Sequence, residues 1–337
     1  MPPNDGPAAA TRARVALGDI SKRPEHNKAI GQLGKPLEPA KKALAKPRDN
    51  LANAFETLAV PSKEVDKVDI PDVQDAQSVV PYLQEIHDHY RKSEAIHLAA
   101  STYITKQEDI NEKMRAILID WLVEVHLKFK LMPETLYLTV NLIDRYLEKE
   151  KIKRSHLQLV GVTAMFISSK YEEIYAPECR DFVYISDKAY TREQILKMEG
   201  DMLSKLNFQL TTPNSLLFLK RFVKVAGVHA NPRTKTDLLA NYLVELTLQD
   251  YKMLKYLPSQ IAAAATYLSL KTMGANPWSS ELQQHTCYTE AAILPCVRDM
   301  NQLHKNAAAN NLQAVRKKYA QEKHGSVSGI PPVEIAP

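Results

Sequence analysis

Four charged side chains stand within otherwise apolar helical patterns, and their chemistry is the first thing to explain. Arg115 lies beside an apolar stripe, and Asp144 lies next to Ile143 on the inner face of the following helical segment. In an antiparallel helix pair the two would meet. Removing one partner of a buried ion pair costs about 3–5 kcal/mol. We therefore predict that Arg115 and Asp144 form a structural ion pair with no catalytic role.

Lys170 and Glu199 are different, because each ends or interrupts an apolar helical pattern without an evident partner in the chain. Solvated surface charges are the simplest interpretation of such residues. A contact with another protein is the alternative, and spacing alone leaves both open.

The sequence contains no pattern that would support catalysis or a metal site. It has no Gly-rich phosphate loop, no GxSxG and no HExxH. Its three cysteines, Cys179, Cys287 and Cys296, form no CxxC pair. His285 and Cys287 would supply only two ligands, whereas a structural zinc site takes four. We predict a non-enzymatic binding protein without a cofactor or metal.

The basic charge of the chain is confined to its first part. Residues 1–50 hold 10 Lys/Arg and 5 Asp/Glu, a net charge of +5, and residues 51–337 hold 34 of each. A nucleic-acid-binding core is expected to carry its own excess of Lys and Arg. No apolar run approaches the roughly 20 residues that a membrane-spanning helix needs. We therefore expect neither nucleic acid nor membrane as a partner.

Residues 1–75 are predicted to be a disordered basic tail, because they are rich in Pro, Ala and Lys and show no sustained period. Two short motifs lie within the tail. One is Arg14-Val15-Ala16-Leu17-Gly18-Asp19-Ile20, which is either a docking motif or a chance occurrence of Arg-x-x-Leu. The other is the basic run from Lys41 to Arg48, for which a nuclear-import patch and a merely solvated tail are both open.

Beyond the tail, helical periodicity dominates and predicts an all-α protein. A short amphipathic helix over residues 80–93 is expected to dock on the first domain or on a partner. Residues 157–173 are apolar on nearly every side, so this helix must be wrapped by others. We predict a capping box at Ser155 for this helix, another at Thr191 for a later one, and Pro133 at the first position of a third.

The pattern repeats at a shift of 101 residues. The shift aligns residues 164–170 with 265–271, and it also superimposes the apolar positions of two further helices. We predict two five-helix domains, 111–209 and 212–309, each built around a buried third helix. The second is expected to open with Thr212 and Pro213 as its helix start, and a last helix over residues 310–323 to follow.

The chain resembles a B-type mitotic cyclin from about residue 80 to its C-terminus. The segments that carry the resemblance are MRAILIDWLVEVH (114–126), LQLVGVTAMFISSKYEEIYAPE (157–178), DFVYISDKAYT (181–191) and LPSQIAAAA (257–265). The resemblance implies two tandem cyclin boxes. It also implies a non-catalytic regulatory subunit that binds and activates a cyclin-dependent protein kinase at the G2/M transition.

The resemblance also assigns roles to particular residues. The five residues diagnostic of the cyclin box are Arg115, Leu118, Asp144, Lys170 and Glu199. The kinase contacts would be Lys170, Glu199, Tyr171, Leu203, Phe208 and Ile86. A shallow patch for substrates or inhibitors bearing an Arg-x-Leu motif would consist of Met114, Ile117, Leu118, Trp121, Glu124, Leu157 and Gln158.

In the tail, Arg14, Leu17, Gly18 and Ile20 are similar to the cyclin destruction box, although Lys22 stands where the family usually has asparagine. This similarity implies recognition by the anaphase-promoting ubiquitin ligase and ubiquitin-dependent degradation. The resemblance to the family also leads us to expect shuttling between nucleus and cytoplasm. One other class shares the double five-helix repeat, namely the DNA-binding core of general transcription initiation factors. The neutral charge of residues 51–337 disfavours it.

Overall fold

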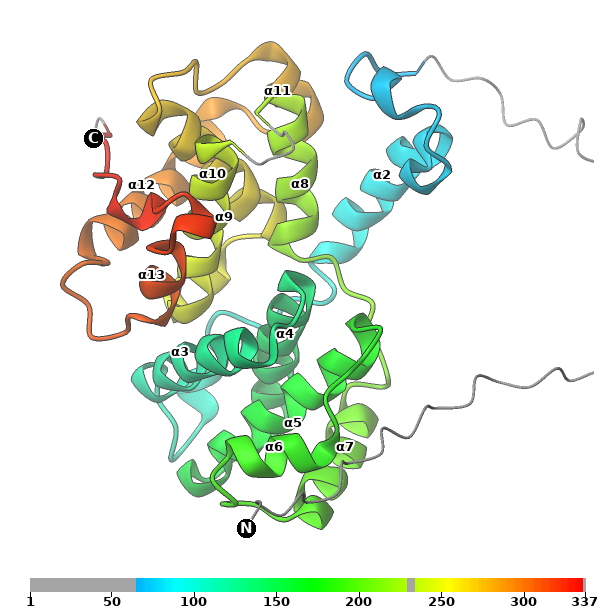
Figure 1. Cartoon of the computed structure of the whole chain (residues 1–337), viewed down its shortest axis with the longest axis vertical. Coiled ribbons are helices and arrows are strands. Elements are labelled where there is room, and N and C mark those ends of the chain that lie inside the picture. The colour runs from blue at the N-terminus through cyan, green and yellow to red at the C-terminus, as the bar shows by residue number, and fades with distance from the viewer. Residues whose placement is uncertain (1–64, 229–233, 336–337) are drawn as a thin grey trace, which may run out of the picture. The chain divides into compact units, whose positions relative to one another are not determined.

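The computed structural model describes residues 65–228 and 234–335, and within them the chain is helical with no β-strand (Figure 1). The first described element is a run of 3₁₀ turns at Ile70–Asp72, Ala76–Ser78 and Val80–Tyr82. They lead into helix α2, Leu83–Glu94. Residues 65–75 were predicted to belong to the disordered tail, and this is wrong, because acidic side chains there bind a basic helix as described below.

The first repeat contains five helices, α3 Glu112–Phe129, α4 Pro133–Lys149, α5 Arg154–Glu172, α6 Cys179–Ile185 and α7 Arg192–Lys205. Pro133 occupies the start of α4. Thr191 and Gln194 form a reciprocal capping box at α7, as expected. The capping box predicted at Ser155 does not form. Instead Asp109, from the segment that precedes α3, accepts a hydrogen bond of 2.8 Å from the Arg154 backbone N–H.

The second repeat contains α8 Ser215–Val225, α9 Lys235–Gln249, α10 Pro258–Thr272, α11 Ser280–Thr286 and α12 Glu290–Asn306. The helix order matches that of the first repeat. Asn214, rather than Thr212, caps α8, because its side chain accepts hydrogen bonds from the backbone of Leu216 and Leu217. The predicted start at Thr212 was therefore two residues too early.

Each repeat is built around its third helix. In α5 every residue from 159 to 169 is buried, and in α10 every residue from 261 to 270 is buried. α4 and α7 pack on α5, while α8, α9 and α12 pack on α10. These contacts explain why both helices are apolar nearly all round.

The C-terminal segment joins the two repeats. α13, Ala314–Tyr319, is shorter than the predicted helix and packs against both α3 and α9. Lys318 donates hydrogen bonds of 2.7 Å to both carboxylate oxygens of Glu245, and both side chains are buried. Asp120 on α3 binds Gln249 of α9 and the backbone N–H of Ala314. One segment thus holds α3 of the first repeat and α9 of the second.

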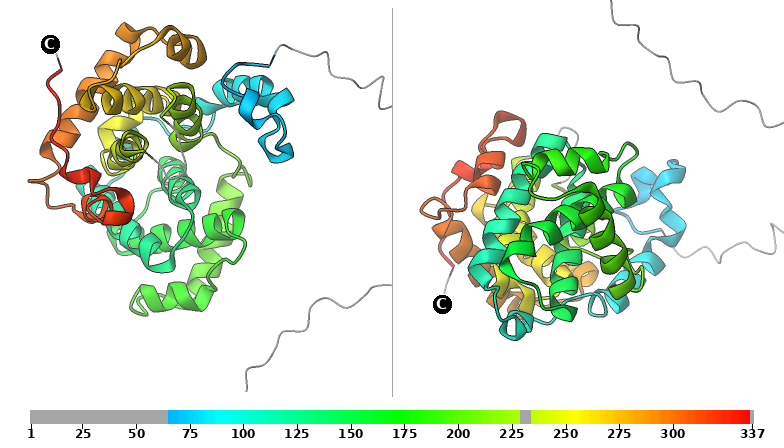
Figure 2. Two further views of the ribbon diagram at one scale, coloured as in Figure 1. Left: turned by 45° about the horizontal axis from the view of Figure 1, so that its top comes forward. Right: turned by 90° about the horizontal axis from the view of Figure 1, so that it is seen from below.

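Helix α2 packs on the second repeat, against α10 (Figures 1 and 2). The sequence had predicted that this helix docks either on the first domain or on a partner, and docking on the first domain is wrong. The ring of Tyr90 meets Phe218 of α8 edge-on at 6.3 Å between centroids. At the other end of α2, Glu94 is buried and accepts hydrogen bonds from the backbone N–H and hydroxyl of Ser259. The carboxylate of Glu94 therefore caps the first turn of α10.

Candidate functional site

Lys170 at the end of α5 and Glu199 in α7 form an ion pair with each other. No partner in the chain was evident from the sequence for either residue, and the packing of α5 against α7 brings the two together. The Lys170 ammonium also lies over the ring of Phe166, 4.2 Å from its centroid. The Lys170 side chain is 46% exposed and that of Glu199 13% exposed. The pair is therefore at the surface, where another protein can reach it.

Exposed aromatic side chains border this ion pair. Tyr171 follows Lys170 and shares a hydrogen bond with Thr211, and Leu203 of α7 is half-buried. Phe208 is 69% exposed and has a φ of 55°. The left-handed conformation is unfavourable for a bulky L-residue, and such strain concentrates at functional sites. Exposure and strain together favour a binding role for Phe208.

Two further apolar residues belong to this surface, and the sequence did not single them out. Ile174 and Tyr175 follow the end of α5 and are 90% and 91% exposed. The sequence does carry a signal for them, because they form an apolar pair directly after Glu172 and Glu173. An apolar pair in a loop that follows two glutamates is not covered by the core. We refer to Lys170, Glu199 and the exposed side chains around them as the α5/α7 face, consisting of Lys170, Tyr171, Ile174, Tyr175, Glu199, Leu203 and Phe208.

Ile86 is separate from this face along the chain. It lies half-buried on α2, which is held by the second repeat. The predicted kinase contacts therefore come from both repeats, five from the first and one from a helix that the second repeat carries.

The predicted docking patch on α3 and α5 is smaller in the structure than expected. Leu118 is only 6% exposed and Leu157 is also buried, so both belong to the core and offer no surface. The surface of the patch consists of Met114, Ile117, Trp121, Glu124 and Gln158. Ile117 is 50% exposed, Glu124 is exposed, and the other three are half-buried. Ile117 and Glu124 lie about two helical turns apart on one face of α3, which suits a ligand that carries one apolar and one cationic side chain.

Leu118 is drawn into the core by the close contact of α3 with α5 at Gly161. A Cβ atom at Gly161 would lie 2.7 Å from Cδ1 of Leu118. The glycine thus permits the close approach of α3, which carries Met114, Ile117 and Trp121, to α5, which carries Gln158.

Arg115 and Asp144 form a buried, bidentate ion pair, with nitrogen–oxygen distances of 2.6 and 2.7 Å. Tyr103 donates a hydrogen bond of 2.8 Å to Asp144, and Arg115 also donates to the carbonyl of Leu248 in α9. Burial opposes the charge on Arg115, but the charge and hydrogen bonds of Asp144 outweigh it and raise the pKa of Arg115. The pair therefore links the two repeats as well as α3 and α4.

Within residues 65–228 and 234–335 no three potential metal ligands come together. His285 is held near Asp66 at 3.1 Å, and Cys287 is exposed without joining it in a cluster. In the same part of the chain, no helix has the length and hydropathy needed to cross a membrane. The destruction-box-like residues Arg14, Leu17, Gly18 and Ile20 lie outside the described residues.

Comparison with known proteins supports this geometry. The chain matches the family models "Cyclin, N-terminal domain" over residues 85–211 and "Cyclin, C-terminal domain" over residues 213–333. The two matches divide the chain where the first five-helix repeat ends and the second begins.

Two relatives are similar over most of the chain. G2/mitotic-specific cyclin-1 from Medicago sativa subsp. varia is 44% identical over 269 residues, which cover 80% of this chain and 62% of the relative. G2/mitotic-specific cyclin-B from Hydra viridissima is 43% identical over 285 residues, which cover 85% of this chain and 70% of the relative. The chain thus spans less than two thirds of the length of the Medicago protein.

A viral cyclin from herpesvirus saimiri has the same fold. The two structures superimpose with a TM-score of 0.59 at 19% identity, over 65% of this chain and 96% of the viral one. The double five-helix architecture, the two family models and the identity to B-type cyclins agree. The chain belongs to the cyclin family, in its B-type, G2/mitotic-specific branch.

Proposed function

We propose that this chain is the non-catalytic regulatory subunit of a mitotic cyclin-dependent protein kinase, which it binds and activates at the G2/M transition. The observation that carries the proposal is the α5/α7 face. It combines a surface ion pair with exposed apolar side chains, and nothing in the described part of the chain covers Ile174 or Tyr175. Contiguous exposed apolar residues of this kind mark protein–protein contacts.

Activation follows from what such a contact does to the partner. A protein kinase is active only when the glutamate of its mobile N-lobe helix pairs with the catalytic lysine. A rigid surface that binds the inward position of this helix better than the outward one shifts the population to the active conformer. The buried helix α5 supplies the rigidity, because Lys170 and Tyr171 extend directly from it.

The docking patch on α3 and α5 is proposed to recruit substrates or inhibitors that bear an Arg-x-Leu motif. Glu124 supplies the carboxylate for the arginine, and Met114, Ile117 and Trp121 supply the apolar surface for the leucine. This patch lies on α3 and the start of α5, whereas the α5/α7 face lies at the opposite end of α5. One buried helix therefore separates kinase binding from substrate docking.

The tail is proposed to carry the degradation signal, with Arg14 and Leu17 as its main contacts for the anaphase-promoting ubiquitin ligase. The basic run near Lys41 and Lys42 supports import, so that the protein is expected in both nucleus and cytoplasm. Substitution of Arg14 and Leu17 by alanine should lengthen the half-life of the chain in mitotic extract. An unaltered half-life would count against the signal.

Activation can be tested with the full chain and a purified mitotic cyclin-dependent kinase. Histone phosphorylation should rise when the chain is added, and both proteins should co-elute in gel filtration. Absence of both effects would contradict the proposal. DNA binding, the activity of the alternative class, is disfavoured because residues 51–337 are electrically neutral and the chain is a cyclin.

A further inference from the structure

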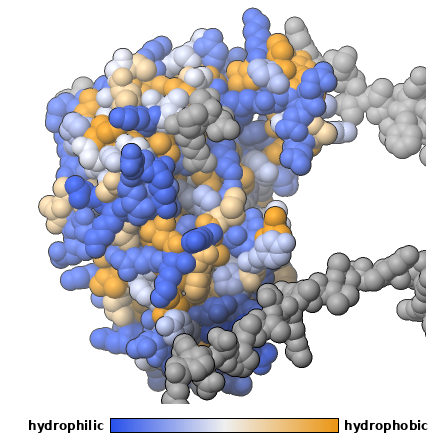
Figure 3. Space-filling view, in the orientation of Figure 1, coloured by the Kyte–Doolittle hydropathy of each residue, from blue (hydrophilic) through white to orange (hydrophobic). Residues whose placement is uncertain are grey.

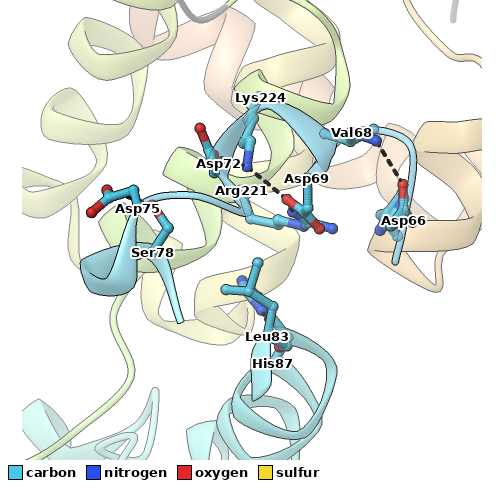
Figure 4. Close-up of polar contacts among 11 residues, drawn as sticks. Asp66, Val68, Asp69, Asp72, Asp75, Ser78, Leu83, His87, Arg221 and Lys224 are labelled. Carbon is cyan, nitrogen blue, oxygen red and sulfur yellow. Dashed lines mark hydrogen bonds and ion pairs between the residues drawn. The ribbon is translucent and has the colours of Figure 1, made fainter. Parts of the chain in front are cut away.

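The segment before α2 is attached to the second repeat by an acidic clasp. We call residues 65–82 the strap. Asp69 is 3% exposed. Its carboxylate accepts hydrogen bonds from the side chains of Arg221 at 2.5 Å and Lys224 at 2.6 Å, both on α8 (Figure 4). Lys224 also pairs with Asp72 at 2.5 Å. Two carboxylates of the strap thus converge on the basic side of one helix.

Ion pairs attach the strap to α8. Asp69 and Asp72 face that helix, whereas Val68 and Val80 are only half-buried. The other large apolar side chains of the strap are exposed, namely Val65, Ile70, Val73, Val79 and Tyr82. Apolar side chains show at the upper right of the space-filling view in Figure 3, over the N-terminal segment. Burial raises the pKa of Asp69, but the hydrogen bonds and charges of Arg221 and Lys224 outweigh it, and the net effect lowers the pKa. A buried carboxylate with two cations depends on all three groups being present.

The backbone of the strap is strained at Val79, shortly before α2 begins. Val79 has a φ of 43° and a ψ of 37°, a conformation that a β-branched residue rarely adopts. Such a conformation persists only when the surroundings on both sides impose it. On one side is the clasp at Asp69. On the other is α2, fixed to the second repeat by Arg91, which donates to the carbonyl of His285 at 2.6 Å, and by Glu94.

We propose that Asp69 is a positioning residue for kinase binding, because its clasp with Arg221 and Lys224 fixes the start of α2 and hence Ile86. This inference rests on the proposed function. It assigns a definite role to the second repeat, which holds the N-terminal helix in the orientation in which that helix contacts the kinase. When the clasp opens, the strap and the first turns of α2 leave this orientation, whereas the cores around α5 and α10 stay folded.

The test compares four forms of the full chain, namely wild type, Asp69→Arg, the charge swap Asp69→Arg with Arg221→Asp, and Asp75→Asn. Asp75 is the matched control, because it is a strap carboxylate whose hydrogen bonds stay within the strap, to Gln77 and Ser78. Hydrogen–deuterium exchange of residues 65–90 reports whether the clasp is closed. Calorimetry with a purified mitotic cyclin-dependent kinase gives the Kd, and circular dichroism reports the fold of the cores.

Asp69→Arg should speed exchange in residues 65–90 and raise the Kd by about tenfold, as expected if the competent fraction falls to about one tenth. The swap should restore both values toward wild type, and Asp75→Asn should leave both unchanged. Faster exchange with an unchanged Kd would overturn the proposal, and so would unchanged exchange. If Asp69→Arg fails to fold, the same two readings are taken on Asp69→Asn, which retains the shape of the side chain. A wild-type chain that does not bind the kinase would instead contradict the proposed function itself.

Discussion

Lys170 and Glu199 pair with each other across the ends of α5 and α7 in the free chain. The positions of both side chains are therefore already fixed in the free chain. Part of the conformational entropy that these side chains would lose on binding a partner is lost on folding instead. Since the pair is also at the surface, its charges can be shared with polar groups of a partner. We accordingly expect the ion pair to add little to the fold, as the proposed binding role of the α5/α7 face requires.

The first prediction concerns the stability of the free chain. Lys170→Ala should lower the free energy of unfolding by less than about 1 kcal/mol, because exposed ion pairs contribute little. Lys205→Ala is the matched control, since Lys205 lies on α7, the helix of Glu199, and forms an exposed pair with Glu150. Urea unfolding measures both. A loss of several kcal/mol in Lys170→Ala alone would mean that the pair is structural.

The buried pair should behave in the opposite way. Arg115→Ala leaves Asp144 without its cation and should cost about 3–5 kcal/mol, measured by urea unfolding. Tyr103→Phe removes one hydrogen bond to the same carboxylate and should cost about 1–3 kcal/mol. Stability equal to wild type in Arg115→Ala would refute the structural role of this pair.

Two helical glycines should respond with opposite signs to the same substitution. Gly161→Ala forces a methyl group against Leu118 and should destabilise the chain by about 1–3 kcal/mol. Gly200→Ala meets no atom within 4 Å and should stabilise α7 by up to about 1 kcal/mol. Thermal unfolding of the two variants provides the comparison, and a stabilised Gly161→Ala would show that α3 and α5 are not in close contact.

The C-terminal segment should be essential for stability. Lys318→Met leaves Glu245 buried and unpaired by a cation, and should cost about 3–5 kcal/mol. Lys317→Met, at the exposed neighbouring position, is the control and should change little. Equal unfolding midpoints in urea for the two variants would show that α13 does not hold the two repeats together.

The helices and their repeat could be predicted from the sequence, because apolar spacing is a local property that survives into the folded chain. The pairing of Arg115 with Asp144 could also be predicted, since both flank apolar stripes on consecutive helices. Lys170 and Glu199 could not, because their meeting depends on how α5 and α7 cross. The cap at Ser155 failed for a similar reason, since Asp109, which is 45 residues from Arg154 in sequence, supplied the hydrogen bond instead. At the second repeat a nearby residue, Asn214, took the capping role expected of Thr212.

The ion pairs of the strap and the pairing of the C-terminal helix with α9 were not predicted. Asp69 is 152 residues from Arg221, and Lys318 is 73 residues from Glu245. No periodicity links residues so far apart, and a charged residue in a polar segment usually indicates solvent exposure. Likewise, Leu118 and Leu157 were predicted to belong to a docking patch, but both are buried, Leu118 because α3 approaches α5 closely at Gly161.

Acidification should destabilise the chain. Burial lowers the pKa of His126 and His304, which are 3% and 5% exposed. In the unfolded chain these histidines take up protons near pH 6.5, whereas in the folded chain they do not. The free energy of unfolding is therefore highest above this pH and falls as the pH drops below it. The loss is at most about 1.4 kcal/mol per pH unit for each histidine. His304→Phe should reduce this slope between pH 7.5 and 5.5, and His156→Phe, at an exposed position, should not. Identical slopes in urea unfolding would contradict the assignment.

Binding of the kinase by the α5/α7 face is tested most directly by a Kd. Calorimetry with a purified mitotic cyclin-dependent kinase should compare the wild-type chain, the double variant Lys170→Ala with Glu199→Ala, and the control Lys205→Ala with Glu150→Ala. We predict a Kd at least about tenfold higher for the first variant, a loss of about 1.4 kcal/mol, and no change for the control. Wild-type affinity in the Lys170 and Glu199 variant would contradict a kinase-binding role for this face.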